Sequence, residues 1–201
     1  NTKMELAAFN ATLKSTATKT ANVAVINTAN SLSYSGIGRF IVERYIPTGI
    51  AHGKSWQLLA VPVSGTQSVK AAWQEGNAPL VVGTSSYGTT ISSEKSGAVS
   101  RGYDFYTPGG PSIKTYNSAS NDWGGIDDGS TNTSALPIAN KKGYMIFVRG
   151  DRSVQTSAAA ANVTTLRTSG KLFALGTDAP ASTTIATAGK YESAGNPYAS
   201  A

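Results

Sequence analysis

The sequence predicts an all-β protein, a β-sandwich of jelly-roll-like or Greek-key type with one short helix. Charged residues make up only 14% of the chain, and its apolar residues, at 40%, are interspersed mainly with glycine, serine, threonine and asparagine. This composition suits short strands joined by turns, because helices need more glutamate, lysine and leucine. Several short segments also alternate apolar and polar residues at a period of two. Since 201 residues allow one sizeable core, we expect residues 1–201 to form a single sandwich module.

The N-terminal stretch predicts two or three half-buried strands. Its apolar residues stand among threonine, serine and lysine at Leu6, Ala8, Leu13, Val23 and Val25. Enough of these positions alternate to favour strands over a helix.

Segments 39–46 and 56–63 carry large apolar side chains on both strand faces. This pattern is typical of central strands that are covered on both sides. Pro47 lacks a backbone donor and should end the first segment. We expect the two strands to be neighbours in one sheet, and Trp56 to lie in the core.

A short helix is predicted over residues 68–74. Val69, Ala72 and Trp73 stand at offsets of three and four, although the segment allows only about two turns. Trp73 is therefore a second core candidate. Beyond the helix, residues 80–82 and 89–91 fit either edge strands or an ordered loop.

The second half of the chain predicts further strands separated by turns. Residues 108–111, Pro-Gly-Gly-Pro, mark a turn between strands within the stretch 103–126. Residues 144–149 predict a strong strand, and residues 164–168 with 171–175 suggest a hairpin around Ser169-Gly170.

The tripeptide Arg149-Gly150-Asp151 is recognised by integrins when a loop tip displays it. Here it follows a hydrophobic strand, which favours a role in packing. Arg149 continues one apolar strand face, so we expect it to be partly buried and to need a carboxylate or carbonyl partner. Glu43 is the first candidate for that partner.

Several sequence blocks recur in an order that resembles a known family. They are Val-Glu-Arg-Tyr-Ile-Pro at 42–47, Trp-Gln-Leu-Leu-Ala-Val-Pro-Val at 56–63, Ala-Trp-Gln-Glu-Gly at 72–76, Lys-Lys-Gly-Tyr-Met-Ile-Phe-Val-Arg-Gly-Asp-Arg at 141–152 and Gly-Asn-Pro-Tyr-Ala-Ser at 195–200. Together they resemble a module of large secreted or cell-surface proteins of Bacteroidota that are exported by the type IX secretion route. The resemblance covers nearly the whole chain.

This resemblance implies an extracellular or cell-surface module with a structural or adhesive role, and it carries over no catalytic residues. In the family, further strands follow the Asn-Pro-Tyr-Ala-Ser block, so it stays open whether the chain is a truncated fragment. Without those strands, a sheet edge near Tyr191 would be left unpaired and would favour pairing with another copy or a neighbouring module, as in a filament subunit.

Composition also argues against several classes of function. The chain has no cysteine and a single histidine, His52, in a polar loop. It carries no nucleophile elbow, P-loop, dinucleotide fingerprint or zinc-protease motif, so we expect no catalysis. The net charge of +6 comes from scattered basic residues, which argues against nucleic-acid binding. The longest apolar runs, such as residues 145–148, are too short for membrane insertion.

A loop rich in aspartate offers one candidate site. Asp122, Asp127 and Asp128, with nearby carbonyls, could ligate calcium. Aspartate beside glycine is also what ordinary turns require, and the spacing does not match an EF-hand. Calcium is therefore the one cofactor to test.

Aromatic residues and carboxylates define two alternative functions. A platform for glycans, as in a carbohydrate-binding module, could be built by Tyr103, Tyr106, Tyr116 and Trp123. A glycoside hydrolase would need two carboxylates close together, and the most plausible members are Glu43, Glu75 and Asp104. For Glu43, an ion pair between strands is the favoured role.

Overall fold

Two four-stranded sheets form a β-sandwich, which confirms the predicted fold class. The computed structural model describes residues 4–24, 26, 32–48, 53–65, 67–174, 185 and 188–199. In chain order the elements are β1 (Met4–Glu5), β2 (Ala11–Leu13), β3 (Leu32–Ser33), β4 (Phe40–Ile46), β5 (Ser55–Leu59), β6 (Val63–Ser64), β7 (Gln67–Ser68), α1 (Val69–Ala72), the 3-10 helix η1 (Val99–Arg101), β8 (Ile113–Asn117), β9 (Asp122–Gly125), β10 (Pro137–Ile138), β11 (Tyr144–Val148) and β12 (Thr164–Leu172).

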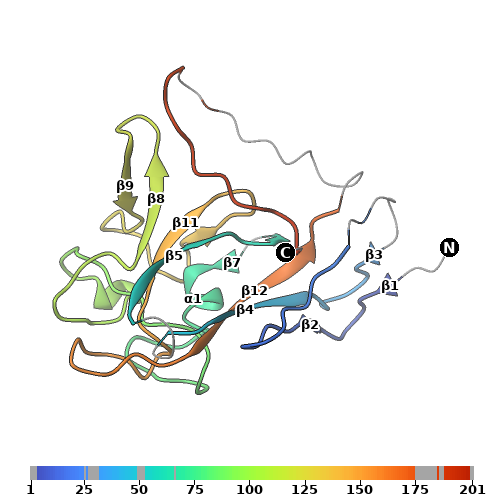
Figure 1. The fold of residues 1–201 in the computed structure, drawn as a ribbon, viewed down its shortest axis with the longest axis horizontal. Helices are drawn as coiled ribbons and strands as arrows, with labels where there is room; N and C mark the ends of the chain where they lie inside the picture. The colour runs from blue at the N-terminus through green and yellow to red at the C-terminus, as the bar shows by residue number, and fades with distance from the viewer. Residues whose placement is uncertain are drawn as a thin grey trace.

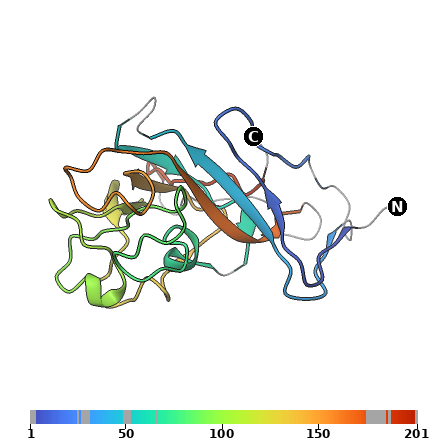
Figure 2. The ribbon, with the colours of Figure 1, turned by 90° about the horizontal axis from the view of Figure 1, so that it is seen from below.

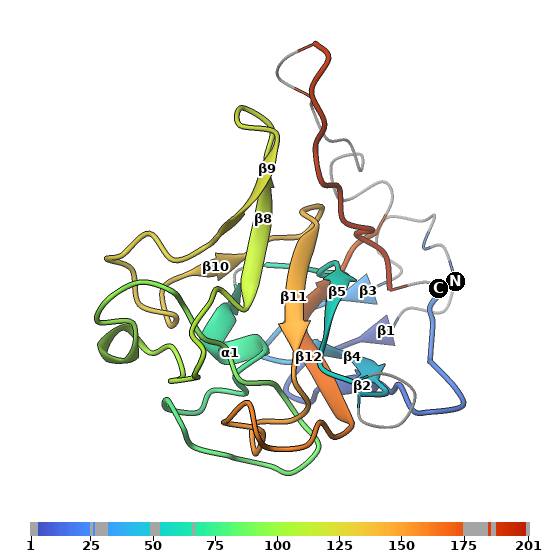
Figure 3. The same cartoon turned by 60° about the vertical axis from the view of Figure 1, so that its left-hand side comes forward.

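The first sheet has the strand order β5-β11-β8-β9 and the second has the order β2-β4-β12-β6. Figure 3 shows β9, β8, β11 and β5 side by side, with β12 and β4 behind them. In Figure 2 the blue β4 lies along the orange β12. The chain passes from β4 to β5 and back to β6, and later from β11 to β12, so it crosses repeatedly between the sheets (Figure 1). Such crossings are typical of Greek-key and jelly-roll sandwiches.

The core lies between the sheets. Phe40 and Leu166 belong to the second sheet, Ile113 and Ile146 to the first, and all four are buried in one hydrophobic cluster. Trp73 joins the layers, because its ring packs edge-on against Tyr144 of β11 at 5.5 Å between ring centres. With an exposed fraction of 2%, Trp73 is a core residue, as predicted.

The pairing of β4 agrees with the prediction of a central strand, since it is flanked by β2 in parallel and β12 antiparallel. The prediction that β5 lies next to β4 in the same sheet is wrong. Strand β5 pairs with β11 in the other sheet, because the chain crosses over after Pro47 instead of turning back.

The hairpin predicted around Ser169-Gly170 is also wrong. Strand β12 continues through both residues and pairs with β4 as far as Gly170. Gly170 does not form a turn but lets the β6 backbone approach closely, since a Cβ at this position would lie 2.3 Å from the Ser64 carbonyl oxygen. A glycine in a strand marks such contacts as readily as it marks turns.

Helix α1 confirms the predicted short helix. The Ser68 hydroxyl caps it by accepting a hydrogen bond from the Ala71 amide at 3.1 Å. A single turn has little stability of its own, so packing against the core through Val69 and Ala72 must hold it in place.

Residues 76–92 form an ordered loop, one of the two forms predicted for this region. A buried ion pair anchors it: Arg152 donates to both carboxylate oxygens of Asp104, each at 2.9 Å. Arg152 also donates to three loop carbonyls, those of Ala78, Val81 and Thr89.

Arg149 is buried, as predicted, but Glu43 is not its partner. The guanidinium donates to the Ser112 hydroxyl at 2.7 Å and to the Thr90 carbonyl at 3.2 Å, and it stacks 3.9 Å from the ring centre of Tyr106. Burial lowers the pKa of this guanidinium. Glu43 lies in the other sheet, where its carboxylate accepts a hydrogen bond from the Ser15 amide.

The Arg149-Gly150-Asp151 tripeptide lies inside the fold. Arg149 is 4% exposed and Asp151 is 3% exposed. Asp151 accepts hydrogen bonds from the Ser86 and Ser153 amides, and so ties loops together. Its environment agrees with the packing role favoured from the sequence.

Near the C-terminus, Ala194 forms an isolated bridge with Lys142, and Tyr191 is exposed. Whether this region offers an edge to another chain stays a prediction. His52 lies outside the described residues.

Candidate functional site

The outward side of the first sheet carries an unusual set of large side chains. Directly paired strand residues point to the same face, and the register pairs Trp56 with Phe147, Tyr116 with Trp123, and Met145 with both Leu58 and Lys114. One face therefore gathers seven residues, which we call the aromatic face: Trp56, Leu58, Lys114, Tyr116, Trp123, Met145 and Phe147.

This face is open to solvent. Leu58 is 74% exposed and Trp56 is 41% exposed. The remaining five members are half-buried by one another. An apolar surface that is held in water in this way marks an interaction site more often than a solitary exposed leucine would.

The rings of the aromatic face form two pairs. Trp56 and Phe147 lie 5.2 Å apart between ring centres, and Tyr116 and Trp123 lie 5.5 Å apart. Lys114 stands between the pairs on β8, with its Nζ 5.2 Å from the Trp56 ring centre. Along β11, Phe147 lies four residues beyond the position that the register places opposite Tyr116. The two aromatic pairs are therefore offset by roughly 13 Å in the strand direction.

The structure brings together half of the predicted aromatic platform. Tyr116 and Trp123 meet on the β8–β9 hairpin, as the platform requires. Tyr103 and Tyr106 were wrongly assigned to it, since they are 1% and 7% exposed and point into the fold. Burial raises the pKa of Tyr103, which belongs to the core cluster, and Tyr106 supports Arg149.

Trp56 was predicted to be a core residue, and that prediction is wrong. It alternates with the half-buried Gln57 on an edge strand, and none of the described strands forms a second layer over the outer face of that sheet. The predicted aromatic platform lacks Phe147 for the same reason, because its strand also has one covered face and one open face. The signal was present in the period-two alternation of both strands, but the sequence did not show which face the second sheet covers.

The three aspartates proposed for calcium do not converge. Asp122 is exposed and bonds the Trp123 amide, and Asp128 accepts from the Ser130 and Thr131 amides of its own turn. Asp127 is buried and forms an ion pair with Arg101 at 2.8 Å. In the part of the chain that the structure describes, no group of three or more histidine or acidic side chains could hold a metal ion.

The environment of Asp127 predicts a pH effect on stability. Burial alone would raise the pKa of Asp127, but hydrogen bonds from Arg101, Ser93 and the Gly129 amide hold it below its ordinary value. The charged form is thus favoured in the folded state. Its contribution to stability is present above the unfolded pKa of about 3.9 and is lost as the pH falls through the lower folded pKa.

We therefore expect the wild-type protein to lose more stability than Asp127→Asn when the pH is lowered from about 7 to about 3. Urea melts of both proteins at the two pH values measure this difference. Equal losses in the two proteins would contradict a stabilising role for the charged carboxylate.

The carboxylates considered for glycoside hydrolysis are each committed elsewhere. Glu75 pairs with Arg167, Asp104 pairs with Arg152, and Glu43 accepts from the Ser15 amide. The favoured ion pair of Glu43 is not among the ion pairs of the described residues. Its cross-strand neighbour on β12 is Arg167, which turns to Glu75 instead.

No protein-family model matches the chain, and no curated protein or solved structure matches it significantly. Within the described ranges, no helix is long and apolar enough to cross a bilayer.

Proposed function

We propose that the protein is a non-catalytic adhesive module of a secreted or cell-surface protein, and that it binds oligosaccharides through the aromatic face. The observation that carries this proposal is the presence of two solvent-facing aromatic pairs on one rigid sheet. Aromatic rings bury the apolar faces of sugar rings and lose little conformational entropy on binding, because they have only two rotatable side-chain bonds.

The layout of the face favours an extended ligand. The Trp56–Phe147 and Tyr116–Trp123 pairs are separated by several strand residues, so one sugar ring cannot contact both. Lys114 lies between them and supplies an ammonium donor for hydroxyl or carboxylate oxygens. The polar tip of the β8–β9 hairpin adds exposed amide groups at Asn117 and Asn121.

Two further points support the adhesive and non-catalytic parts of the proposal. The blocks of sequence that resemble secreted Bacteroidota modules favour an extracellular role. The candidate acids Glu43, Glu75 and Asp104 are occupied by separate partners, which disfavours a hydrolytic pair. A filament role, which depends on the C-terminal edge, stays a second proposal.

A glycan array with purified wild-type protein and Trp123→Ala tests this proposal. We expect the wild type to bind a set of related oligosaccharides and Trp123→Ala to lose at least tenfold in affinity. Tyr191→Ala is the matched control, since Tyr191 is an exposed aromatic residue outside the face. A blank array, or equal binding by the wild type and Trp123→Ala, would reject the proposal, and so would glycan turnover by the purified protein.

A further inference from the structure

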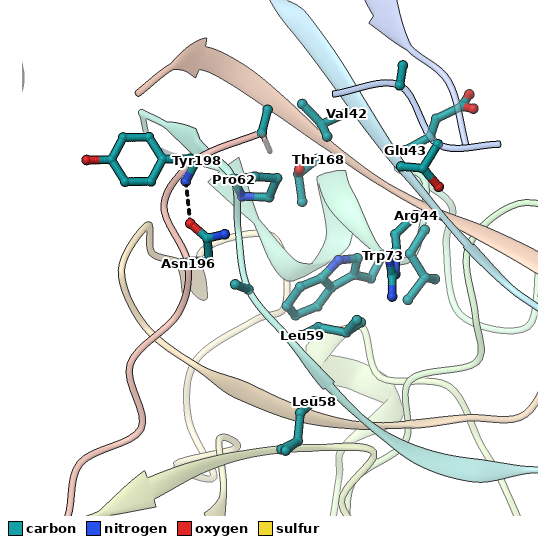
Figure 4. A pocket seen from close by; sticks show the side chains of 15 residues that line it. Val42, Glu43, Arg44, Leu58, Leu59, Pro62, Trp73, Thr168, Asn196 and Tyr198 are labelled. Carbon is teal, nitrogen blue, oxygen red and sulfur yellow. Dashed lines mark hydrogen bonds between the residues drawn. The ribbon is translucent and has the colours of Figure 1, made fainter. Parts of the chain in front are cut away.

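A pocket of about 390 Å³ lies between the two sheets, on the side where β5 forms the edge of its sheet (Figure 4). It is separate from the outward aromatic face, although Leu58 reaches its rim. Its walls come from β4, β12, the end of β5, residues 20–21, and Asn196, Tyr198 and Ala199 near the C-terminus. The volume is at the lower end of the range for small-molecule sites in proteins.

Most of the pocket wall is apolar. Val42 of β4, Leu166 of β12, and Leu59 and Pro62 from the β5 side line it together with the ring of Trp73. Figure 4 shows the Trp73 ring between the sheets, on the same side as Val42, Leu59 and Pro62. The pocket therefore suits the apolar body of a ligand.

Thr168 and Arg44 line the wall, and the side chain of neither has a partner among the residues that the structure describes. The hydroxyl of Thr168 is buried and makes no hydrogen bond. Leaving a buried hydroxyl unsatisfied is unfavourable, so this position favours a ligand that can supply the missing bond.

The second group is the guanidinium of the exposed Arg44, and no other described lysine or arginine lines the pocket. The three ion pairs of the described residues do not include it. Arg44 faces Leu166 across the strand pair and Val42 faces Thr168, so Arg44 and Thr168 belong to the same strand face. Glu43 also contributes to the pocket lining, but its side chain alternates to the other face of β4, where the carboxylate accepts a hydrogen bond from the Ser15 amide, and Figure 4 shows that carboxylate directed away from Trp73.

We infer that this pocket binds a small amphipathic carboxylate. Its apolar body would pack on Trp73, its carboxylate would pair with Arg44, and the Thr168 hydroxyl would hydrogen-bond a polar group of the ligand. A single cation beside an apolar cavity matches one anionic head on an apolar body, and the charge-assisted hydrogen bonds of arginine to a carboxylate are strong. This inference is independent of oligosaccharide binding, because the two sites share neither Arg44 nor Trp73.

Isothermal titration with decanoate, and with 1-decanol as its uncharged counterpart, tests the inference. We expect saturable binding of decanoate at one site and at least a tenfold loss of decanoate affinity in Arg44→Met. Lys95→Met, which removes an exposed cation on a distant loop, should bind like the wild type. Binding of 1-decanol should be the same in Arg44→Met and the wild type.

Thr168→Val keeps the shape of the side chain and removes its hydroxyl, so it should weaken decanoate binding without emptying the pocket. Two results would overturn the inference. The first is no saturable decanoate binding, as when a strand of a second copy fills the pocket. The second is an equal loss of decanoate and 1-decanol affinity in Arg44→Met. The second result would show that the variant had disturbed the pocket without removing a charge contact.

Discussion

Replacement of Trp73 by alanine is expected to lower the free energy of unfolding by about 3–5 kcal/mol, the usual cost of deleting a large buried aromatic side chain. Trp73 is 2% exposed and lies between the two sheets, where it packs on Tyr144 and lines the same pocket as Leu166. Removing the indole would leave a void beside the existing pocket. The neighbouring strands are tied into ladders and cannot move in to fill it.

Trp56→Ala is the matched control, because it removes the same side chain from the open face. We expect it to cost about 1 kcal/mol, the scale of one aromatic pair. Urea melts followed by circular dichroism measure both variants, and Trp73→Phe provides a milder change if the alanine variant does not fold. Equal costs at the two positions would contradict the assignment of Trp73 to the core and Trp56 to the surface.

Replacement of Arg152 by methionine should also destabilise the fold by about 3–5 kcal/mol, since it leaves the buried Asp104 carboxylate without its counter-charge. The side chains of this pair are 1% and 2% exposed. The change also removes the donors that hold the carbonyls of Ala78, Val81 and Thr89. Residues 76–92 should therefore loosen first, and their amides should exchange faster with solvent.

Arg167→Met is the control for this prediction. It breaks an ion pair of the same kind, with Glu75, but the side chain of Arg167 is 32% exposed. Its partner Glu75 is 10% exposed, against 2% for Asp104, and no loop carbonyl loses a donor, so we expect Arg167→Met to lower the free energy of unfolding by less than Arg152→Met does. A smaller effect at Arg152 than at Arg167, or unchanged amide exchange in residues 76–92, would argue against the anchoring role of the buried pair.

The fold was largely predictable because its signals are local. Large apolar residues on both strand faces identified β4 and β5, a hydrophobic run identified β11, and the offsets of Val69, Ala72 and Trp73 identified α1. The pairing of strands was not predictable in the same way. Whether β5 lies beside β4 or crosses to the other sheet depends on contacts between distant residues, and the space at Gly170 depends on the approach of β6.

The candidate site was predicted in part, for a related reason. Tyr116 and Trp123 sit on one tight hairpin, so their closeness follows from the local sequence. Trp56 and Phe147 join them only through the pairing of β5, β11 and β8, which is non-local. A large aromatic residue in a strand fits a buried face and a binding face equally well, and only the position of the second sheet distinguishes them.

The most direct test of oligosaccharide binding follows the side-chain N–H signals of the three tryptophans by NMR. Trp56→Phe, Trp73→Phe and Trp123→Phe assign the signals, and the titrants are soluble neutral and acidic oligosaccharides. The proposal predicts that one class of oligosaccharide shifts the Trp56 and Trp123 signals along a single saturation curve while the Trp73 signal stays in place. If no oligosaccharide shifts Trp56 and Trp123, or if only Trp73 responds, the aromatic face is not the binding site.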